Sequence, residues 1–178
     1  GMGRSGTLFA YQQENIEPDI VALAKGLGGG FPVGAVMAKA KVGDAMIPGT
    51  HGSTFGGNPL AMRSANAVMD LLLEDDFLKT LRENITYFDN KMDALINDDD
   101  KVSPVILCKK GSGMLRGFQL KENVNAGDFG NISREKGLLL VGAAENTIRL
   151  LPPLNTSKKE IDQAFEILSE VIKEIKKN

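Results

Sequence analysis

A lysine between two short apolar runs, followed by glycines, constrains how the N-terminal part of this chain can fold. The first run, Ile20–Leu23, follows Pro18 and is closely followed by Lys25. Five glycines then occur between residues 26 and 34, and a second apolar run covers Phe31–Met37. Short apolar runs bounded by glycine and proline are typical of strands. The pattern therefore predicts two strands with a lysine in the tight connection between them.

The two runs lack the alternation of apolar and polar residues that marks a strand with one wet face. Strands covered on both faces read as continuous apolar runs, as in parallel sheets. We therefore expect Ile20–Leu23 and Phe31–Met37 to belong to a mostly parallel sheet with both faces covered.

Composition excludes several classes of protein. Hydrophobic residues make up 42% of the 178 residues and charged residues 25%, which permits a buried core. The net charge of −2 favours neither nucleic acid nor an anionic membrane as a partner. No apolar stretch is long enough to span a bilayer. The single Cys108 cannot form an internal disulfide, which suits a cytoplasmic location.

Local signals place the other elements. Asn58-Pro59 is typical of a helix start, and Ser157–Glu160 reads as a capping box. Small residues on the early part of the helix after Asn58 predict close packing against another segment. The expected helices are 38–46, 59–72, 77–96, 125–136 and one after Ser157, and the later strands are 105–108, 114–120, 138–141 and 147–151.

The sequence pattern around Lys25 is about equally compatible with two interpretations. Lys25 is either a strand-end lysine with its ammonium in water, or an amine held in a pocket. Desolvation lowers the pKa of a pocketed amine and makes it nucleophilic toward an aldehyde, as a Schiff base to pyridoxal phosphate requires. The glycines after Lys25 would let the loop turn sharply beside a flat ring.

Ser53 and Thr54 supply two adjacent hydroxyls just before a predicted helix N-terminus. Such a position suits a phosphate, although an ordinary loop with a helix cap is the commoner explanation. His51, the only histidine, has no neighbour at metal-ligand spacing, so we predict no metal site. The G-x-G-x-x-G match at Gly1–Gly6 lacks a strand before it and a helix after it, and therefore reads as a turn.

Arg149 lies in the apolar run Thr147–Leu151. A planar, permanently charged side chain there suggests a carboxylate partner, either buried or on a substrate. An arginine that faces water from an edge strand is about equally compatible with the pattern.

Taken together, four stretches in chain order resemble the class III pyridoxal-phosphate-dependent aminotransferases. Within that family, the sequence of Ala24–Gly30 is most similar to that of the acetylornithine aminotransferases. The motifs are long and specific, and they cover nearly the whole chain. They read "GMGRSGTLFAYQ", "PDIVALAKGLGGGFPVGAVMAK", "HGSTFGGNPLA" and "IRLLPPLN".

The resemblance implies a role for each candidate residue. Lys25 matches the lysine that forms the Schiff base with pyridoxal 5'-phosphate and later moves the proton at the substrate α-carbon. Thr54, with Ser53 beside it, matches the segment that binds the cofactor phosphate across a homodimer interface. Arg149 matches an arginine that engages a carboxylate of the substrate or of a gating glutamate. The implied reaction transfers an amino group from N-acetylornithine to 2-oxoglutarate, in arginine biosynthesis.

The implied fold is α/β, the C-terminal part of the type I pyridoxal-phosphate-dependent aminotransferase fold. Residues 1–76 would end the large cofactor-binding domain, and residues 77–178 would form a small α+β domain. The family's aspartate for the pyridine nitrogen would precede Gly1, so the chain alone is expected to be inactive. The alternatives are another class III ω-aminotransferase, acting on ornithine, succinylornithine or 4-aminobutyrate, or a non-catalytic dimerising fragment.

Overall fold

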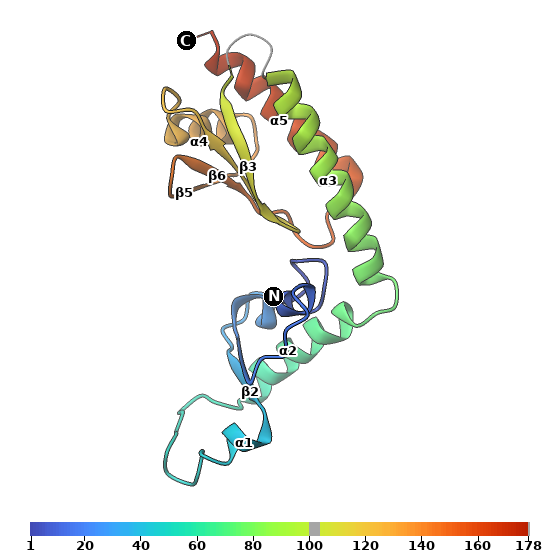
Figure 1. The fold of residues 1–178 in the computed structure, drawn as a ribbon, viewed down its shortest axis with the longest axis vertical. Helices are drawn as coiled ribbons and strands as arrows, with labels where there is room; N and C mark the ends of the chain where they lie inside the picture. The colour runs from blue at the N-terminus through green and yellow to red at the C-terminus, as the bar shows by residue number, and fades with distance from the viewer. Residues whose placement is uncertain (100–103, 178) are drawn as a thin grey trace. The chain divides into compact units, whose positions relative to one another are not determined.

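The computed structural model describes residues 1–99 and 104–177, which fall into two compact units, Gly1–Lys79 and Thr80–Asn178. Figure 1 colours the chain from blue in the first unit to red at the end of the second. Each unit is described by itself. Within the described residues, no helix combines the length and the apolar character needed to cross a membrane.

The first unit contains one two-stranded sheet, in which β1 and β2 pair antiparallel. Ile20 lies opposite Ala38, and Leu23 lies opposite Ala35. Its elements are η1 (Ala10–Gln13), β1 (Ile20–Leu23), η2 (Lys25–Gly28), β2 (Ala35–Ala38), α1 (Ala40–Gly43) and α2 (Pro59–Leu72).

The prediction of a mostly parallel, covered sheet is wrong for these strands. The connection 24–34 is too short for the crossover of about a dozen or more residues that parallel strands need, so the chain reverses and pairs antiparallel. The faces also stay open, since Ile20 is 56% exposed and Val36 is 70% exposed. The second strand begins only at Ala35, after the predicted start at Phe31.

Helix α2 begins where the sequence predicts. The Asn58 side chain accepts a hydrogen bond from the Ala61 N–H, and Pro59 occupies the first turn. This cap satisfies one of the free N–H groups at the helix start and fixes where the helix begins. Ala61 and Ala65 are buried on the small-residue face of the helix.

The second unit is a four-stranded antiparallel sheet with helices beside it. The strand order is β3-β4-β6-β5, and β3 and β4 form the predicted hairpin. Helices α3 and α5 run side by side along the sheet (Figure 1). The elements are α3 (Phe77–Asp99), β3 (Ile106–Ser112), β4 (Leu115–Leu120), α4 (Ala126–Glu135), β5 (Val141–Ala143), β6 (Thr147–Leu150) and α5 (Lys158–Ile175).

The core of this unit lies between the sheet and the helices. Phe118 is fully buried and Ile148 is 1% exposed, and these two residues pair across β4 and β6. Phe88 of α3 meets Phe165 of α5 edge to face, with ring centroids 5.4 Å apart. Such an aromatic pair adds to the free energy gained from apolar burial.

Strand β5 covers Val141–Ala143 and not the predicted 138–141, because residues 138–140 stay outside the sheet. Leu138 exchanges two hydrogen bonds with Ser133 at the end of α4: its N–H donates to the Ser133 carbonyl, and its carbonyl accepts from Ser133 Oγ. These bonds use the backbone groups of Leu138, and pairing with β6 begins at Val141.

Candidate active site

Lys25 opens the short helix η2, one residue after strand β1. Its backbone φ is +51°, in the left-handed region that residues other than glycine rarely adopt. The side chain is exposed, and no hydrogen bond or ion pair involves its ammonium within the described residues. Unusual backbone of this kind persists only where the surrounding packing enforces it, so the neighbours of the turn matter.

The turn that carries Lys25 is packed against α2. Ser64 Oγ donates a hydrogen bond of 2.8 Å to the Gly28 carbonyl, which lies 36 residues earlier in the chain. Gly29 has φ +59°, and a Cβ built on it would lie 2.8 Å from Val68 Cγ2. Leu27, 6% exposed, anchors the turn from within. The helix and the glycine turn therefore approach more closely than side chains at these positions would allow.

An open cavity lies beside the lysine. Its lining combines one amine with apolar side chains and glycine backbone, from Lys25, Gly26, Gly29, Gly30, Phe31, Pro32 and Val33. Such a surface can receive a flat, partly apolar molecule and present an amine to its edge.

Ser53 and Thr54 lie in the exposed loop between α1 and α2. This loop projects from the first unit (Figure 1). No hydrogen bond joins either hydroxyl to Lys25 in the part of the chain that the structure describes. The structure therefore does not bring this predicted phosphate segment into contact with the lysine of the same chain.

Arg149 lies on β6, which pairs with β4 on one side and β5 on the other. It is therefore not on an edge strand, and that reading of the sequence is wrong. Gly117 and Val141 stand opposite it on the neighbouring strands. The residue is half-buried, and its Nε is buried without a hydrogen-bond partner among the described residues. A buried donor without a partner costs free energy, and an acceptor bound there would offset that cost.

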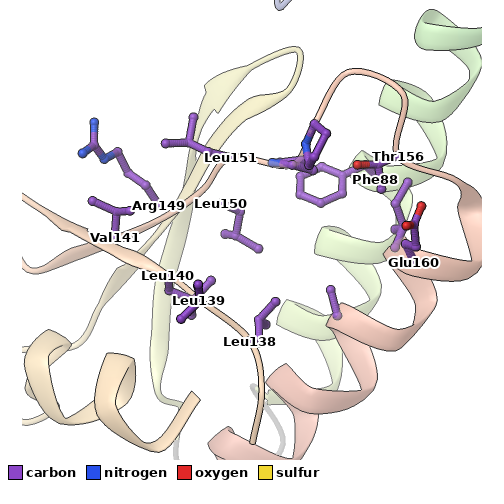
Figure 2. A pocket seen from close by; sticks show the side chains of 14 residues that line it. Phe88, Leu138, Leu139, Leu140, Val141, Arg149, Leu150, Leu151, Thr156 and Glu160 are labelled. Carbon is purple, nitrogen blue, oxygen red and sulfur yellow. The ribbon is translucent and has the colours of Figure 1, made fainter. Parts of the chain in front are cut away.

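Arg149 also borders an apolar cavity of about 340 Å³ within the second unit (Figure 2). Figure 2 shows the guanidinium directed away from Phe88 and Glu160 on the far side of the cavity. The other lining residues are Leu138, Leu139, Leu140, Val141, Leu150, Leu151, Pro152, Pro153, Thr156, Ile161 and Ala164. Leu139 is 79% exposed, because residues 138–140 leave the sheet here.

The charge at the opposite rim belongs to a helix cap. The pKa of Glu160 is lowered, first by the hydrogen bond from the Ser157 backbone N–H and then by the Ser157 hydroxyl. This carboxylate is therefore engaged in the capping box of α5. No group of histidine, cysteine and acidic side chains suited to a metal ion occurs in residues 1–99 and 104–177.

Ser64 is the residue near Lys25 that sequence reasoning missed. The small-residue face of α2 predicts close packing, and the structure confirms it against the glycine turn. Nothing in the local pattern identifies which hydroxyl would bond to a carbonyl so far back in the sequence.

The family model for class III aminotransferases matches residues 1–172 of this chain. Because the match covers nearly the whole length, the chain belongs to the class III aminotransferase family. The predicted fold class, α/β with part of the type I pyridoxal-phosphate-dependent aminotransferase fold, is confirmed. The assignment of residues 1–76 and 77–178 to its large and small domains stays a prediction.

Several relatives carry one name. The chain is 44% identical over 174 residues to an acetylornithine aminotransferase of Streptococcus mutans, covering 98% of this chain and 44% of that protein. It is 42% identical over 172 residues to the acetylornithine aminotransferase of Aquifex aeolicus, covering 97% and 42% of the two chains. The chain therefore spans less than half the length of these curated relatives.

Solved structures agree on the fold. The ornithine aminotransferase of Plasmodium yoelii superposes with a TM-score of 0.89 at 31% identity, over 98% of this chain and 46% of that one. The acetylornithine aminotransferase of Elizabethkingia anophelis gives 0.88 at 33% identity, over 98% and 43%. These identities lie close together, so structural likeness alone does not choose between the two named substrates.

Proposed function

We propose that the protein containing this chain transfers an amino group from N-acetylornithine to 2-oxoglutarate with pyridoxal 5'-phosphate, as a cytoplasmic homodimer in arginine biosynthesis. The observation that carries the proposal is the free amine of Lys25 on an enforced left-handed turn beside a glycine-lined cavity. The names of the relatives with 44% and 42% identity favour N-acetylornithine as the donor.

The residues around Lys25 fit this cofactor. Pyridoxal phosphate presents an aldehyde on a flat ring, and when bound it supplies an electron sink for the substrate α-carbon. The cavity offers one amine for the aldehyde, and the apolar side chains of Phe31 and Val33 for a ring face. Gly29 and Gly30 place no side chain in that space.

Lys25 performs two tasks in this proposal. Its Nζ would hold the cofactor at its aldehyde group, and the same amine would move the proton at the substrate α-carbon. Both tasks require an amine that no carboxylate engages, and no ion pair holds Lys25 in the described residues. The enforced backbone at Lys25 restricts where Nζ can lie, which supports a role that depends on position.

Ser53 and Thr54 bind the cofactor phosphate of a second copy in this proposal. Their hydroxyls lie on an exposed, projecting loop and make no hydrogen bond to Lys25 of the same chain in the described residues. This position supports binding to the phosphate in the cavity of the second copy. Hydroxyls and free N–H groups near a helix start are suited to a phosphate.

Arg149 binds a carboxylate of the substrate or of a gating glutamate in this proposal. Its buried, unpaired Nε supports such an acceptor, because a bidentate carboxylate would satisfy the guanidinium. Residues 1–76 then belong to the large cofactor domain and residues 77–178 to the small domain. We also propose that residues 1–178 alone do not catalyse the reaction, since the relatives are more than twice as long.

Steady-state kinetics on the full-length protein test the proposal. N-acetylornithine, ornithine, succinylornithine and 4-aminobutyrate are compared as donors to 2-oxoglutarate, and the highest kcat/KM is expected for N-acetylornithine. A clear preference for another donor would overturn the substrate assignment and leave the family intact. The variant Lys25→Ala serves as the control and is expected to lack transamination while retaining the fold, because the side chain is exposed.

A non-catalytic dimerising role is the competing proposal for the 178-residue chain. It predicts a stable dimer of this chain that gains no covalent adduct after treatment with cofactor and borohydride.

A further inference from the structure

We propose that Ser64 is a positioning residue for Lys25, acting through its hydrogen bond to the Gly28 carbonyl. The inference rests on the proposed function of Lys25 and concerns what holds that lysine in place. It assigns a purpose to a polar side chain in the middle of a helix that the reaction itself does not use.

The backbone of Lys25 needs support from outside its own turn. A φ of +51° is unfavourable for a lysine, so the turn would relax if its surroundings allowed other conformations. Within η2, the Leu27 N–H donates to the Ala24 carbonyl over 3.1 Å, and the Gly29 N–H donates to the Gly26 carbonyl over 3.3 Å. These two local bonds close the turn but do not fix it relative to a rigid element.

Helix α2 supplies the rigid element. It begins at the Asn58 cap and buries Ala61, which lies three residues before Ser64 on the same side of the helix. From that position Ser64 Oγ donates to the Gly28 carbonyl at 2.8 Å. The bond connects the helix to the carbonyl of the last residue of η2, three residues after Lys25.

The hydroxyl of Ser64 bonds differently from that of another helical serine in this chain, Ser169. A serine inside a helix usually bonds back to a carbonyl one turn earlier, and alanine forms helix more readily. Ser169 of α5 shows that ordinary behaviour, with its Oγ donating 2.9 Å to the Phe165 carbonyl. Ser64 donates to the lysine turn instead, so its hydroxyl ties two segments that are distant in sequence.

The test compares three variants of the full-length protein. Ser64→Ala removes the hydroxyl, Ser64→Thr keeps it, and Ser169→Ala is the matched control, because it removes another half-buried helical hydroxyl outside the site. Three quantities are measured: kcat, the pH midpoint of the visible absorbance of bound pyridoxal phosphate, and the rate of Lys25 reductive methylation by formaldehyde and cyanoborohydride without cofactor. Lys41, an exposed lysine, is the internal reference for methylation.

We expect Ser64→Ala to lower kcat about three- to tenfold, the loss that corresponds to one hydrogen bond. It should also shift the absorbance midpoint and change the Lys25 methylation rate at least about threefold relative to Lys41. Ser64→Thr should restore all three quantities, and Ser169→Ala should leave them unchanged.

Wild-type values of all three quantities in Ser64→Ala would overturn the inference, as would a Ser64→Thr variant that behaves like Ser64→Ala. Failure of the proposed function would be visible separately, as absent transamination in the wild type. The methylation ratio would still report in that case whether Ser64 positions Lys25.

Discussion

The two units bury their apolar side chains to different extents. In Thr80–Asn178, Met92, Phe118 and Leu168 have no exposed surface, and the sheet closes against its helices. In Gly1–Lys79 fewer apolar residues are buried, while Val36 is 70% exposed and Phe55 is 80% exposed. The candidate catalytic lysine lies in the less buried unit.

This difference shows that a site can be held locally where no large core surrounds it. Lys25 is fixed by a cap, a helix hydroxyl and close glycine packing, each of which involves only a few atoms. The second unit, in contrast, holds Arg149 on an interior strand backed by a closed core. Substitutions matched between the units should therefore differ strongly in cost.

The largest difference is expected for phenylalanine. Phe118→Ala should lower the free energy of unfolding of the 178-residue chain by about 3–5 kcal/mol, because it removes a fully buried ring. Phe55→Ala should change it by less than about 0.5 kcal/mol, since that ring is mostly exposed. Denaturant titration measures both, and similar losses in the two variants would contradict the comparison.

Two strand glycines of the second unit, Gly117 and Gly142, differ in the space around them. A Cβ on Gly117 would lie 2.9 Å from the Ile148 carbonyl oxygen, whereas a Cβ on Gly142 would meet nothing within 4 Å. Gly117→Ala should therefore cost about 1–3 kcal/mol, and Gly142→Ala should be neutral or slightly stabilising. Thermal unfolding compares them. If Gly117→Ala were as neutral as Gly142→Ala, the strands would tolerate a side chain opposite Arg149, which would contradict this expectation.

The smallest effect concerns helix caps and pH. Because the pKa of Glu160 is lowered by Ser157, its carboxylate stabilises the folded chain above the unfolded-state pKa of about 4.3. That contribution is lost as pH falls through the lower, folded-state pKa. Glu160→Gln should thus reduce the melting temperature at pH 7, and the gap to wild type should close in acid.

The uncharged cap of the first unit supplies the control. Asn58→Ala should cost about 1 kcal/mol with little dependence on pH, because an amide does not titrate in this range. Parallel pH dependence in the two variants would show that Glu160 does not act through its charge.

Sequence reasoning succeeded where the signal is local. Asn58-Pro59 and the Ser157–Glu160 box start helices because neighbouring residues satisfy the free N–H groups. It failed at residues 138–140, which stay outside the sheet while the backbone of Leu138 bonds to Ser133 and not to β6. The mostly parallel, covered sheet predicted for β1 and β2 is not found, because the short connection, and not the apolar pattern, sets the strand direction.

The candidate site divides in the same way. Lys25 could be predicted as a candidate catalytic residue from the glycines around it and from the family resemblance. Its left-handed backbone and the bond from Ser64 could not, since both depend on how a helix packs against a turn 36 residues earlier. The interior position of Arg149 likewise depends on strand pairing with β4 and β5.

The most direct measurement is covalent trapping of the cofactor on the full-length protein. Pyridoxal phosphate is added, borohydride reduces the bond to the protein, and peptide mass spectrometry locates the adduct. We predict a single adduct on the peptide that carries Lys25, absent from Lys25→Ala. An adduct on another lysine, or an unmodified Lys25 in a protein that transaminates, would contradict it.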